Sequence, residues 1–219
     1  MLFSNNDRIV FTGDSTTDAG RKRPYGEGLW EGVGNGYVRT LDSLLKTVYP
    51  EQTFRIANTG SSGFTSRALL ETWDHDVTAL NPDWVFVMIG INDVMRYFDE
   101  PNTMSYEYVT LDEYRANLTE MVNRTKPSVK GMFLVSPFYM EPNDEDAMKV
   151  LTRKYVQVMK EVAEATGVGF IDLQPDFDAH TAHCYPAAIS WDRVHPNWVG
   201  GTIIARRLWH EIGADERAF

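Results

Sequence analysis

The sequence predicts an α/β fold in which helices cover both faces of a parallel β-sheet. Short apolar runs recur along the chain, and longer amphipathic stretches separate them. This alternation of strands and helices is typical of a parallel sheet packed between helices. In addition, three polar segments directly follow apolar runs, at the sheet edge where open α/β folds bind their ligands. The 219 residues are within the range of one domain, and we expect a single domain over residues 1–219.

The apolar runs that we expect to form strands are short, and several are rich in Val, Ile and Phe. Such composition is typical of strands that are buried on both faces. In order along the chain, they occupy residues 8–12, 54–57, 84–89, 132–135 and 169–173.

Four stretches have features of helices. Residues 37–49, 111–125 and 144–166 carry apolar side chains at helical spacing. We expect the last helix to begin after Asn197, a favourable N-cap residue, and to end near Gly213.

The glycine-rich segment 26–36 (GEGLWEGVGNG) is predicted to be a loop beside Ser15. Its glycines do not form a GxGxxG motif directly after a strand, so a dinucleotide site is not predicted.

Composition excludes several classes of partner. The formal net charge is −10, which argues against nucleic acid and anionic membranes. Cys184 is the single cysteine, so no internal disulfide is possible. Because the N-terminus lacks a basic segment followed by a long apolar one, and no run of about 18 apolar residues occurs, we expect a cytoplasmic protein.

Ser15 follows the first predicted strand, in the segment FTGDSTTDAG (residues 11–20). On this segment alone, the favoured interpretation is helix capping, because Ser, Thr and Asp are preferred N-cap residues. The alternative is that Ser15 is a nucleophile at the carboxyl end of a parallel strand.

The segment WDRVHPN (residues 191–197) carries Asp192 and His195, which are three positions apart. This spacing allows the carboxylate to reach Nδ1 of the imidazole, which would fix the tautomer and stabilise the imidazolium. An isolated DxxH is more often a surface ion pair. Together with Ser15, however, it supplies the Ser, His and Asp of a catalytic triad.

Acyl transfer also needs hydrogen-bond donors for the oxyanion of its tetrahedral intermediate. Three candidates follow three different strands: the N–H of Ser15, the N–H of Gly63 and the side-chain amide of Asn92. Taken singly, Gly63 fits a simple turn and Asn92 fits an Asx turn.

These segments resemble the four blocks of the SGNH hydrolases, or GDSL-type esterases, and they occur in the family's order. Ser15 in GDST matches the nucleophile block, Gly63 in NTGSSGFTS the glycine block, and Asn92 in GIND the asparagine block. Asp192 and His195 in DRVHPN match the final block. The resemblance runs from about residue 8 to residue 210.

The resemblance implies a three-layer α/β/α sandwich with a five-stranded, flavodoxin-like parallel sheet. It also implies that Ser15, Asp192 and His195 are catalytic, with an oxyanion hole formed by Ser15, Gly63 and Asn92. No cofactor or metal is implied, and a homo-oligomer is favoured. One departure is Thr at position 16, where the family often has Leu; this residue is not catalytic. No GxSxG motif occurs, so an ordinary α/β-hydrolase is excluded.

Finer similarity points to the carbohydrate acetyl esterases, including acetylxylan esterases. It lies in stretches such as GRKRPYGEG, GFTSRALLETWDHDV and YPAAISWDRVHPNWVG. Trp191, Tyr185 and Trp30 are candidates for stacking on a sugar ring, with core or subunit-interface roles as the alternative. Asp14 is included as a substrate-binding candidate, although its position beside Ser15 favours a structural hydrogen bond.

Other titratable residues invite a second interpretation. His180 and His183 lie near Asp176 and Asp178 and resemble part of a metal site, but the sequence identifies no definite third ligand. Cys184 is expected to be a small buried hydrophobe rather than a nucleophile.

The resulting prediction is a cofactor-free serine esterase that removes acetyl groups from carbohydrates such as xylo-oligosaccharides. The alternatives are a lysophospholipase or thioesterase of the same family, and a non-catalytic carbohydrate-binding protein.

Overall fold

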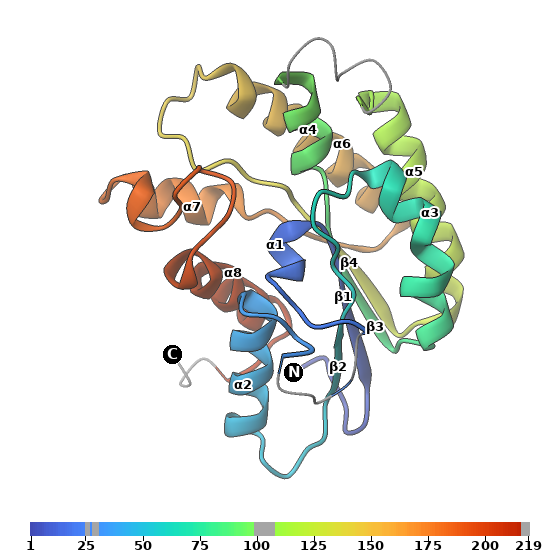
Figure 1. The fold of residues 1–219 in the computed structure, drawn as a ribbon. Helices are drawn as coiled ribbons and strands as arrows, with labels where there is room; N and C mark the ends of the chain where they lie inside the picture. Colours follow the sequence, from blue (N-terminus) through green and yellow to red (C-terminus); the bar gives the residue numbers. More distant parts are fainter. Residues whose placement is uncertain (25–26, 28–30, 99–107, 216–219) are drawn as a thin grey trace.

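A five-stranded parallel sheet forms the centre of the computed structural model, which describes residues 1–24, 27, 31–98 and 108–215 (Figure 1). The strands are β1 (Arg8–Gly13), β2 (Arg55–Asn58), β3 (Trp84–Met88), β4 (Gly131–Val135) and β5 (Gly169–Ile171). Their order across the sheet is β2-β1-β3-β4-β5, and every neighbouring pair is parallel. The connection from β1 to β2 and the connection from β3 to β4 run in opposite directions along the sheet, and ligands bind at such a switch point.

The helices are α1 (Ser15–Asp18), α2 (Tyr37–Val48), α3 (Ser66–Asp76), α4 (Ile91–Phe98), α5 (Leu111–Thr125), α6 (Ala147–Thr166), α7 (Gln174–Thr181) and α8 (Trp198–Glu211). Helices α1 to α6 lie in the connections between successive strands, and α7 and α8 follow β5. Three short 3₁₀ turns, η1 (Thr78–Leu80), η2 (Lys126–Ser128) and η3 (Pro186–Ala188), complete the described elements. None of the helices in the described ranges has the length and apolarity that crossing a bilayer requires.

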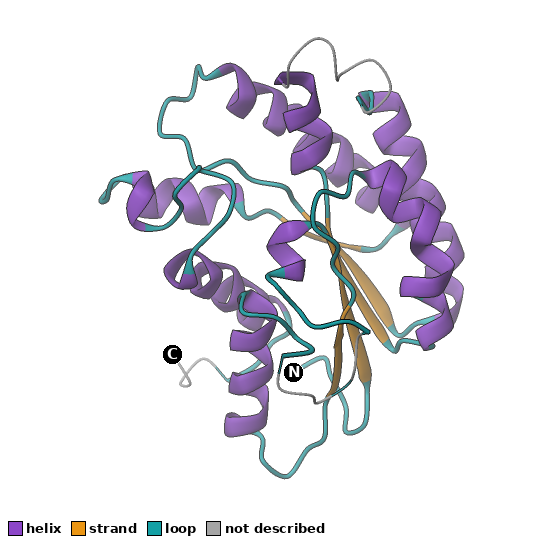
Figure 2. Cartoon of the chain, viewed as in Figure 1, coloured by secondary structure: helices purple, strands orange, loops and turns teal. Residues whose placement is uncertain are grey.

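Helices cover both faces of the sheet (Figure 2), and an apolar core lies between the sheet and each helical layer. Helices α2 and α8 pack on one face, while α3, α5 and α6 pack on the other. Alternation along β3 places Phe86 in the first core and Val85 and Val87 in the second. The predicted three-layer α/β/α sandwich is therefore confirmed.

All five predicted strands and four predicted helices are present, with ends that differ by at most three residues. The helices α3 and α4 were not predicted from the sequence. In α3, Trp73 and Leu69 are buried among polar neighbours, so the apolar pattern of this helix is weak. The segment 31–36 lies against α1 as expected, since Asn35 N donates to Ala19 O at 2.8 Å.

Gly13 ends β1 in a conformation that favours glycine. Its φ is +150°, and a Cβ at this position would overlap the carbonyl oxygen of Met88 in β3. The close approach of the two strands ends the sheet here, and the next two residues, Asp14 and Ser15, begin α1.

Candidate active site

Ser15 and His195 come together at the carboxyl edge of the sheet. Ser15 Oγ lies 2.8 Å from His195 Nε2. The imidazole side chain is 50% exposed, so a substrate can reach it from solvent. In this position, the ring is placed to take the proton of the hydroxyl group.

Asp192 holds the other side of the imidazole. His195 Nδ1 lies 2.6 Å from Asp192 Oδ2, while Asp192 Oδ1 accepts from the backbone N–H of His195 at 2.8 Å and of Val194 at 3.0 Å. Burial alone would raise the pKa of Asp192, but the hydrogen bonds from His195 and Val194 outweigh it and lower the pKa to about 2. The carboxylate is therefore charged at neutral pH.

Ser15 is the first residue of α1, and Asp14 is the N-cap. Asp14 Oδ1 accepts from Thr16 N at 2.9 Å, and the Asp14 side chain is buried. Burial, with a smaller contribution from the nearby charge of Asp93, raises the pKa of Asp14 to about 7. The side chain of Asp14 is thus buried and caps α1 through the structural hydrogen bond that its position beside Ser15 favoured.

The loop that carries Gly63 is joined to α1. Ser62 donates both its backbone N–H and its hydroxyl group to Asp18 Oδ2, each at 3.0 Å. Gly63 itself is exposed and has a φ of +81°, and a Cβ there would meet no atom within 4 Å. The backbone conformation at position 63, rather than crowding, therefore explains why a glycine is present there.

Asn92 lies in the first turn of α4, at the end of β3, and is mostly buried. One hydrogen of its amide is donated to Phe64 O at 2.9 Å. A primary amide has two donors, so this bond orients the side chain and leaves its second N–H for another acceptor.

Arg193 lies inside the turn between Asp192 and His195 and has a φ of +66°. Three contacts hold it to the segment after β4. Met140 N donates to Arg193 O at 2.9 Å, the guanidinium group pairs with Glu141, and its Cζ lies 5.4 Å from the centroid of the Tyr139 ring. These contacts support a left-handed conformation that costs free energy in a non-glycine residue.

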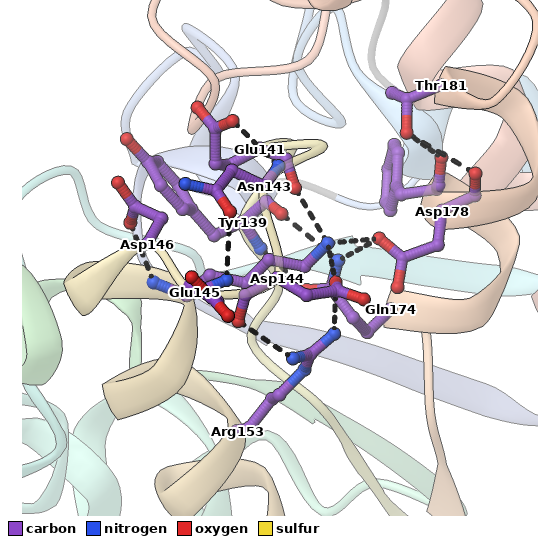
Figure 3. Close-up of polar contacts among 12 residues, drawn as sticks. Tyr139, Glu141, Asn143, Asp144, Glu145, Asp146, Arg153, Gln174, Asp178 and Thr181 are labelled. Carbon is purple, nitrogen blue, oxygen red and sulfur yellow. Dashed lines mark hydrogen bonds and ion pairs between the residues drawn. The ribbon is translucent and has the colours of Figure 1, made fainter.

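A buried polar network supports the segment after β4 (Figure 3). Lys149 Nζ donates to Glu141 O at 2.7 Å and to Asp178 Oδ1 at 2.8 Å. Gln174 exchanges two hydrogen bonds with the backbone of Tyr139, at 2.9 and 3.0 Å, and donates to Asp178 at 2.8 Å. Helices α6 and α7 are thereby connected to the turn that carries the Asp192–His195 pair.

The predicted aromatic residues differ in their outcome. Trp191 is 92% exposed beside Asp192, and Tyr185 is 80% exposed. Neither side chain is part of the core, so the alternative that these residues fill the core is wrong. Trp30 lies outside the described residues.

The metal interpretation of the histidines gains no support from the geometry. His180 is in the last turn of α7, but His183 follows the end of that helix. Within the ranges that the structure describes, no three His, Cys, Asp or Glu side chains are grouped closely enough to hold a metal ion. Cys184 is partly buried against the first core, as predicted for a small apolar residue.

Sequence reasoning missed the residues that support the site. Asp18, Arg193 and Lys149 act through contacts with segments that are distant in the sequence. A buried lysine is invisible to a pattern search, because its surroundings depend on the fold. The acidic residue Asp18, three positions after Ser15, was the one feature of the sequence that could have indicated a supporting role.

An α/β/α sandwich with a hydrogen-bonded Ser–His–Asp chain at the carboxyl edge of its sheet has the architecture of a serine hydrolase. The comparisons with known proteins define the class further. A model of the GDSL-like lipase/acylhydrolase family matches residues 11–202, and the chain belongs to this family. It is a carboxylic ester hydrolase.

The similarity to known proteins and to solved structures extends over almost the whole chain. An acetylxylan esterase from Geobacillus stearothermophilus is 47% identical over 213 residues, with 97% of each chain covered. The crystal structure of Axe2, an acetylxylan esterase from the same organism, matches with a TM-score of 0.94, 46% identity and 98% coverage of each chain. LAE5, an α/β hydrolase from the metagenome of Lake Arreo, matches with a TM-score of 0.94, 44% identity and coverage of 97% of this chain and 98% of its own.

Proposed function

We propose that this chain is a serine esterase that removes acetyl groups from carbohydrates, with acetylated xylo-oligosaccharides as substrates. The observation that carries the proposal is the continuous hydrogen-bonded chain from Ser15 Oγ through His195 to Asp192. The similar acetylxylan esterase supports the choice of acetyl group and sugar. Structures of Axe2 described as catalytic mutants replace a serine, an aspartate and a histidine, of which the last two are three positions apart, as in this chain.

In the proposed first step, Ser15 Oγ attacks the ester carbonyl while His195 Nε2 takes the hydroxyl proton. The charged Asp192 stabilises the resulting imidazolium. The carbonyl oxygen becomes an oxyanion, which accepts hydrogen bonds from Ser15 N–H, Gly63 N–H and the free amide hydrogen of Asn92. When the C–O bond to the sugar breaks, His195 returns the proton to the leaving oxygen, and an acetyl-enzyme remains.

Water then hydrolyses the acetyl-enzyme by the reverse sequence. His195 takes a proton from the water as it attacks the acetyl carbon, and the second oxyanion occupies the same donors. Collapse releases acetate and returns the proton to Ser15 Oγ. The cycle needs no redox cofactor, because each step is an acyl or proton transfer.

The substrate assignment is supported by exposed aromatic surface near the catalytic turn. Trp191 directly precedes Asp192, and its ring is available to stack on the apolar face of a sugar. We also propose that the chain is a homo-oligomer. Exposed aromatic rings such as Tyr185 and Trp198 are suited to a subunit interface, and native mass spectrometry with their alanine variants tests this.

The decisive experiment incubates acetylated xylo-oligosaccharides with the wild type and with Ser15→Ala, followed by mass spectrometry. We expect loss of acetyl groups with the wild type and none with the variant. Comparison of p-nitrophenyl acetate with the octanoate tests the alternative of a lysophospholipase or thioesterase. Preference for the octanoate, or deacetylation by Ser15→Ala, would overturn the proposal.

A further inference from the structure

Asp93 is a fully buried carboxylate that has no role in the proposed chemistry. It directly follows Asn92 in the first turn of α4, and both of its oxygens face the start of α3. Ser66 N lies 3.1 Å from Oδ1 and 3.0 Å from Oδ2, and Ser66 Oγ donates to Oδ1 at 2.6 Å. Burial of a carboxylate is unfavourable unless its hydrogen bonds compensate for lost hydration.

A third helix contributes to the same contact. Asn117 in α5 donates its amide to Ser66 Oγ at 3.0 Å. The hydroxyl group of Ser66 is completely buried, and it donates to Asp93 while it accepts from Asn117. Helices α3, α4 and α5 therefore meet in one connected hydrogen-bond network.

This network joins the two segments that carry the proposed oxyanion donors. Gly63 lies three residues before Ser66, and Asn92 lies one residue before Asp93. A second bond runs beside the first, from Asn92 Nδ2 to Phe64 O at 2.9 Å. Two neighbouring bonds fix both the separation and the relative orientation of two segments, whereas one bond leaves rotation about itself.

We propose that Asp93 is a positioning residue that holds the Gly63 N–H and the Asn92 side-chain amide in register as donors to one oxyanion. This inference rests on the proposed function, since it requires an oxyanion at that point. Donors that are fixed before the reaction stabilise developing charge without reorganisation. A movement of the Gly63 loop relative to α4 weakens that stabilisation, even though both donors remain present.

An effect of the Asp93 charge and a positioning role for Asp93 predict opposite changes in kcat when this residue is replaced. Asp93 adjoins Asn92 in α4, and a negative charge near a forming oxyanion by itself opposes the reaction. Replacement by a neutral residue would then increase kcat. The positioning role predicts a decrease, because the acceptor for Ser66 is lost.

The test measures kcat and KM for p-nitrophenyl acetate in Asp93→Ala, Asp93→Asn and Ser66→Ala. We expect Asp93→Ala to lower kcat by about 10- to 100-fold and to change KM by less than about 3-fold, since ground-state binding does not use the oxyanion. Asp93→Asn retains one acceptor for Ser66 and should keep more activity than the alanine variant. The Asp93→Ala/Ser66→Ala double variant should be no slower than Asp93→Ala, because the bond from the Ser66 hydroxyl group to Asp93 is already lost in Asp93→Ala.

Binding of a small alkylboronic acid gives a second readout. Its tetrahedral adduct with Ser15 places an oxygen where the oxyanion forms, so its affinity should fall in parallel with kcat/KM. A purely structural role for Asp93 would lower thermal stability and leave boronate affinity unchanged.

Thr125→Val is the matched control. Trp73 Nε1 donates to Thr125 Oγ1 at 2.9 Å, a buried bond that also joins α3 to α5 but lies about two helical turns from Ser66. We expect this variant to lose thermal stability with an unchanged kcat. An equal loss of kcat in Thr125→Val would contradict the inference.

Failure of the inference is distinguishable from failure of the proposed function. If Ser15→Ala is inactive while folded Asp93→Ala and Ser66→Ala retain more than half of wild-type kcat, the positioning role is wrong and the esterase proposal stands. If Ser15→Ala is active, the proposed function fails and the inference fails with it. Should Asp93→Ala not fold, Asp93→Asn and Ser66→Ala decide the question.

Discussion

Ser15 Oγ lies 2.8 Å from His195 Nε2, although 180 positions separate the two residues along the chain. Each is fixed by its own local structure: Ser15 by the capped start of α1, and His195 by the turn that Asp192 closes. Contact between them needs only that β1 and the turn before α8 meet at the same sheet edge. The reactive geometry is therefore a property of the whole α/β/α arrangement and is present without any substrate.

Replacement of Asp192 by asparagine should abolish most of the activity. The carbonyl oxygen of the amide can still accept from the N–H groups of Val194 and His195, which directs the amide nitrogen at His195 Nδ1. His195 Nδ1 would then have to accept a hydrogen bond from the amide, so the imidazole proton moves to Nε2. Nε2 can then no longer accept the proton of Ser15. We expect kcat to fall by roughly 10⁴ with little change in thermal stability. If Asp14→Asn has this effect and Asp192→Asn does not, the wrong carboxylate has been assigned.

Asn92 should contribute to the transition state and not to substrate binding. Asn92→Ala is expected to lower kcat by about 10²–10³ and to leave KM nearly unchanged. Asn92→Asp should be worse, because it places a negative charge beside the forming oxyanion. Steady-state kinetics measures both effects, and circular dichroism confirms folding. Retention of more than about a third of wild-type kcat in Asn92→Ala would reduce this residue to a structural one.

The positions of the strands and of the motif residues along the chain could be predicted, because both depend on local patterns. Apolar runs are visible along the chain, and the polar segments with Ser15 and Asn92 directly follow two of them. The DxxH spacing likewise predicted the contact of His195 with Asp192.

The supporting contacts could not be predicted, because each one joins segments that the sequence separates. Lys149 lies in an amphipathic helix and reads as solvated, yet its side chain is 1% exposed. Ser66 and Asp93 are 27 positions apart, and nothing in either local pattern indicates their hydrogen bonds. Exposure of Trp191 and Tyr185 was equally undetermined, since aromatic residues in loops occur both inside and outside the core.

Chelation of metal ions should leave the activity unchanged. The proposed mechanism activates Ser15 through His195, and no step needs a Lewis acid. We expect the same kcat/KM before and after incubation with EDTA. Loss of activity that zinc restores, and that His180→Ala also causes, would instead support a metal site near His180 and His183.

Lys149 should be important for stability. Its side chain is buried, donates to Glu141 O, and pairs with Asp178. Lys149→Met keeps most of the apolar stem but removes the donor to Glu141 O and the cationic partner of Asp144 and Asp178, which we expect to cost about 2–4 kcal/mol because both carboxylates are partly hydrated. Urea unfolding measures the difference. Lys154→Met, the same substitution on the exposed face of α6, should change stability by less than about 0.5 kcal/mol.

The last prediction concerns Asp14 and the dependence of stability on pH. Burial raises the pKa of Asp14 from 3.8 to about 7 in the folded protein. Between these values the folded state holds a proton that the unfolded state has lost, so the contribution of Asp14 to stability is complete below pH 3.8 and disappears as the pH rises through 7. Asparagine cannot lose a proton, and its carbonyl oxygen can still accept from Thr16 N.

Asp14→Asn should therefore gain stability relative to the wild type as the pH rises. Between pH 5 and pH 8, we expect the difference in unfolding free energy to shift in favour of the variant by up to about 3 kcal/mol. Urea unfolding at the two pH values measures this shift, and Asp112→Asn, on the exposed surface of α5, is the control that should show none of this size. A constant difference between Asp14→Asn and the wild type would mean that Asp14 has the same pKa in the folded and unfolded states. The buried cap would then be charged throughout, and its hydrogen bond to Thr16 N would have to compensate for the whole cost of burial.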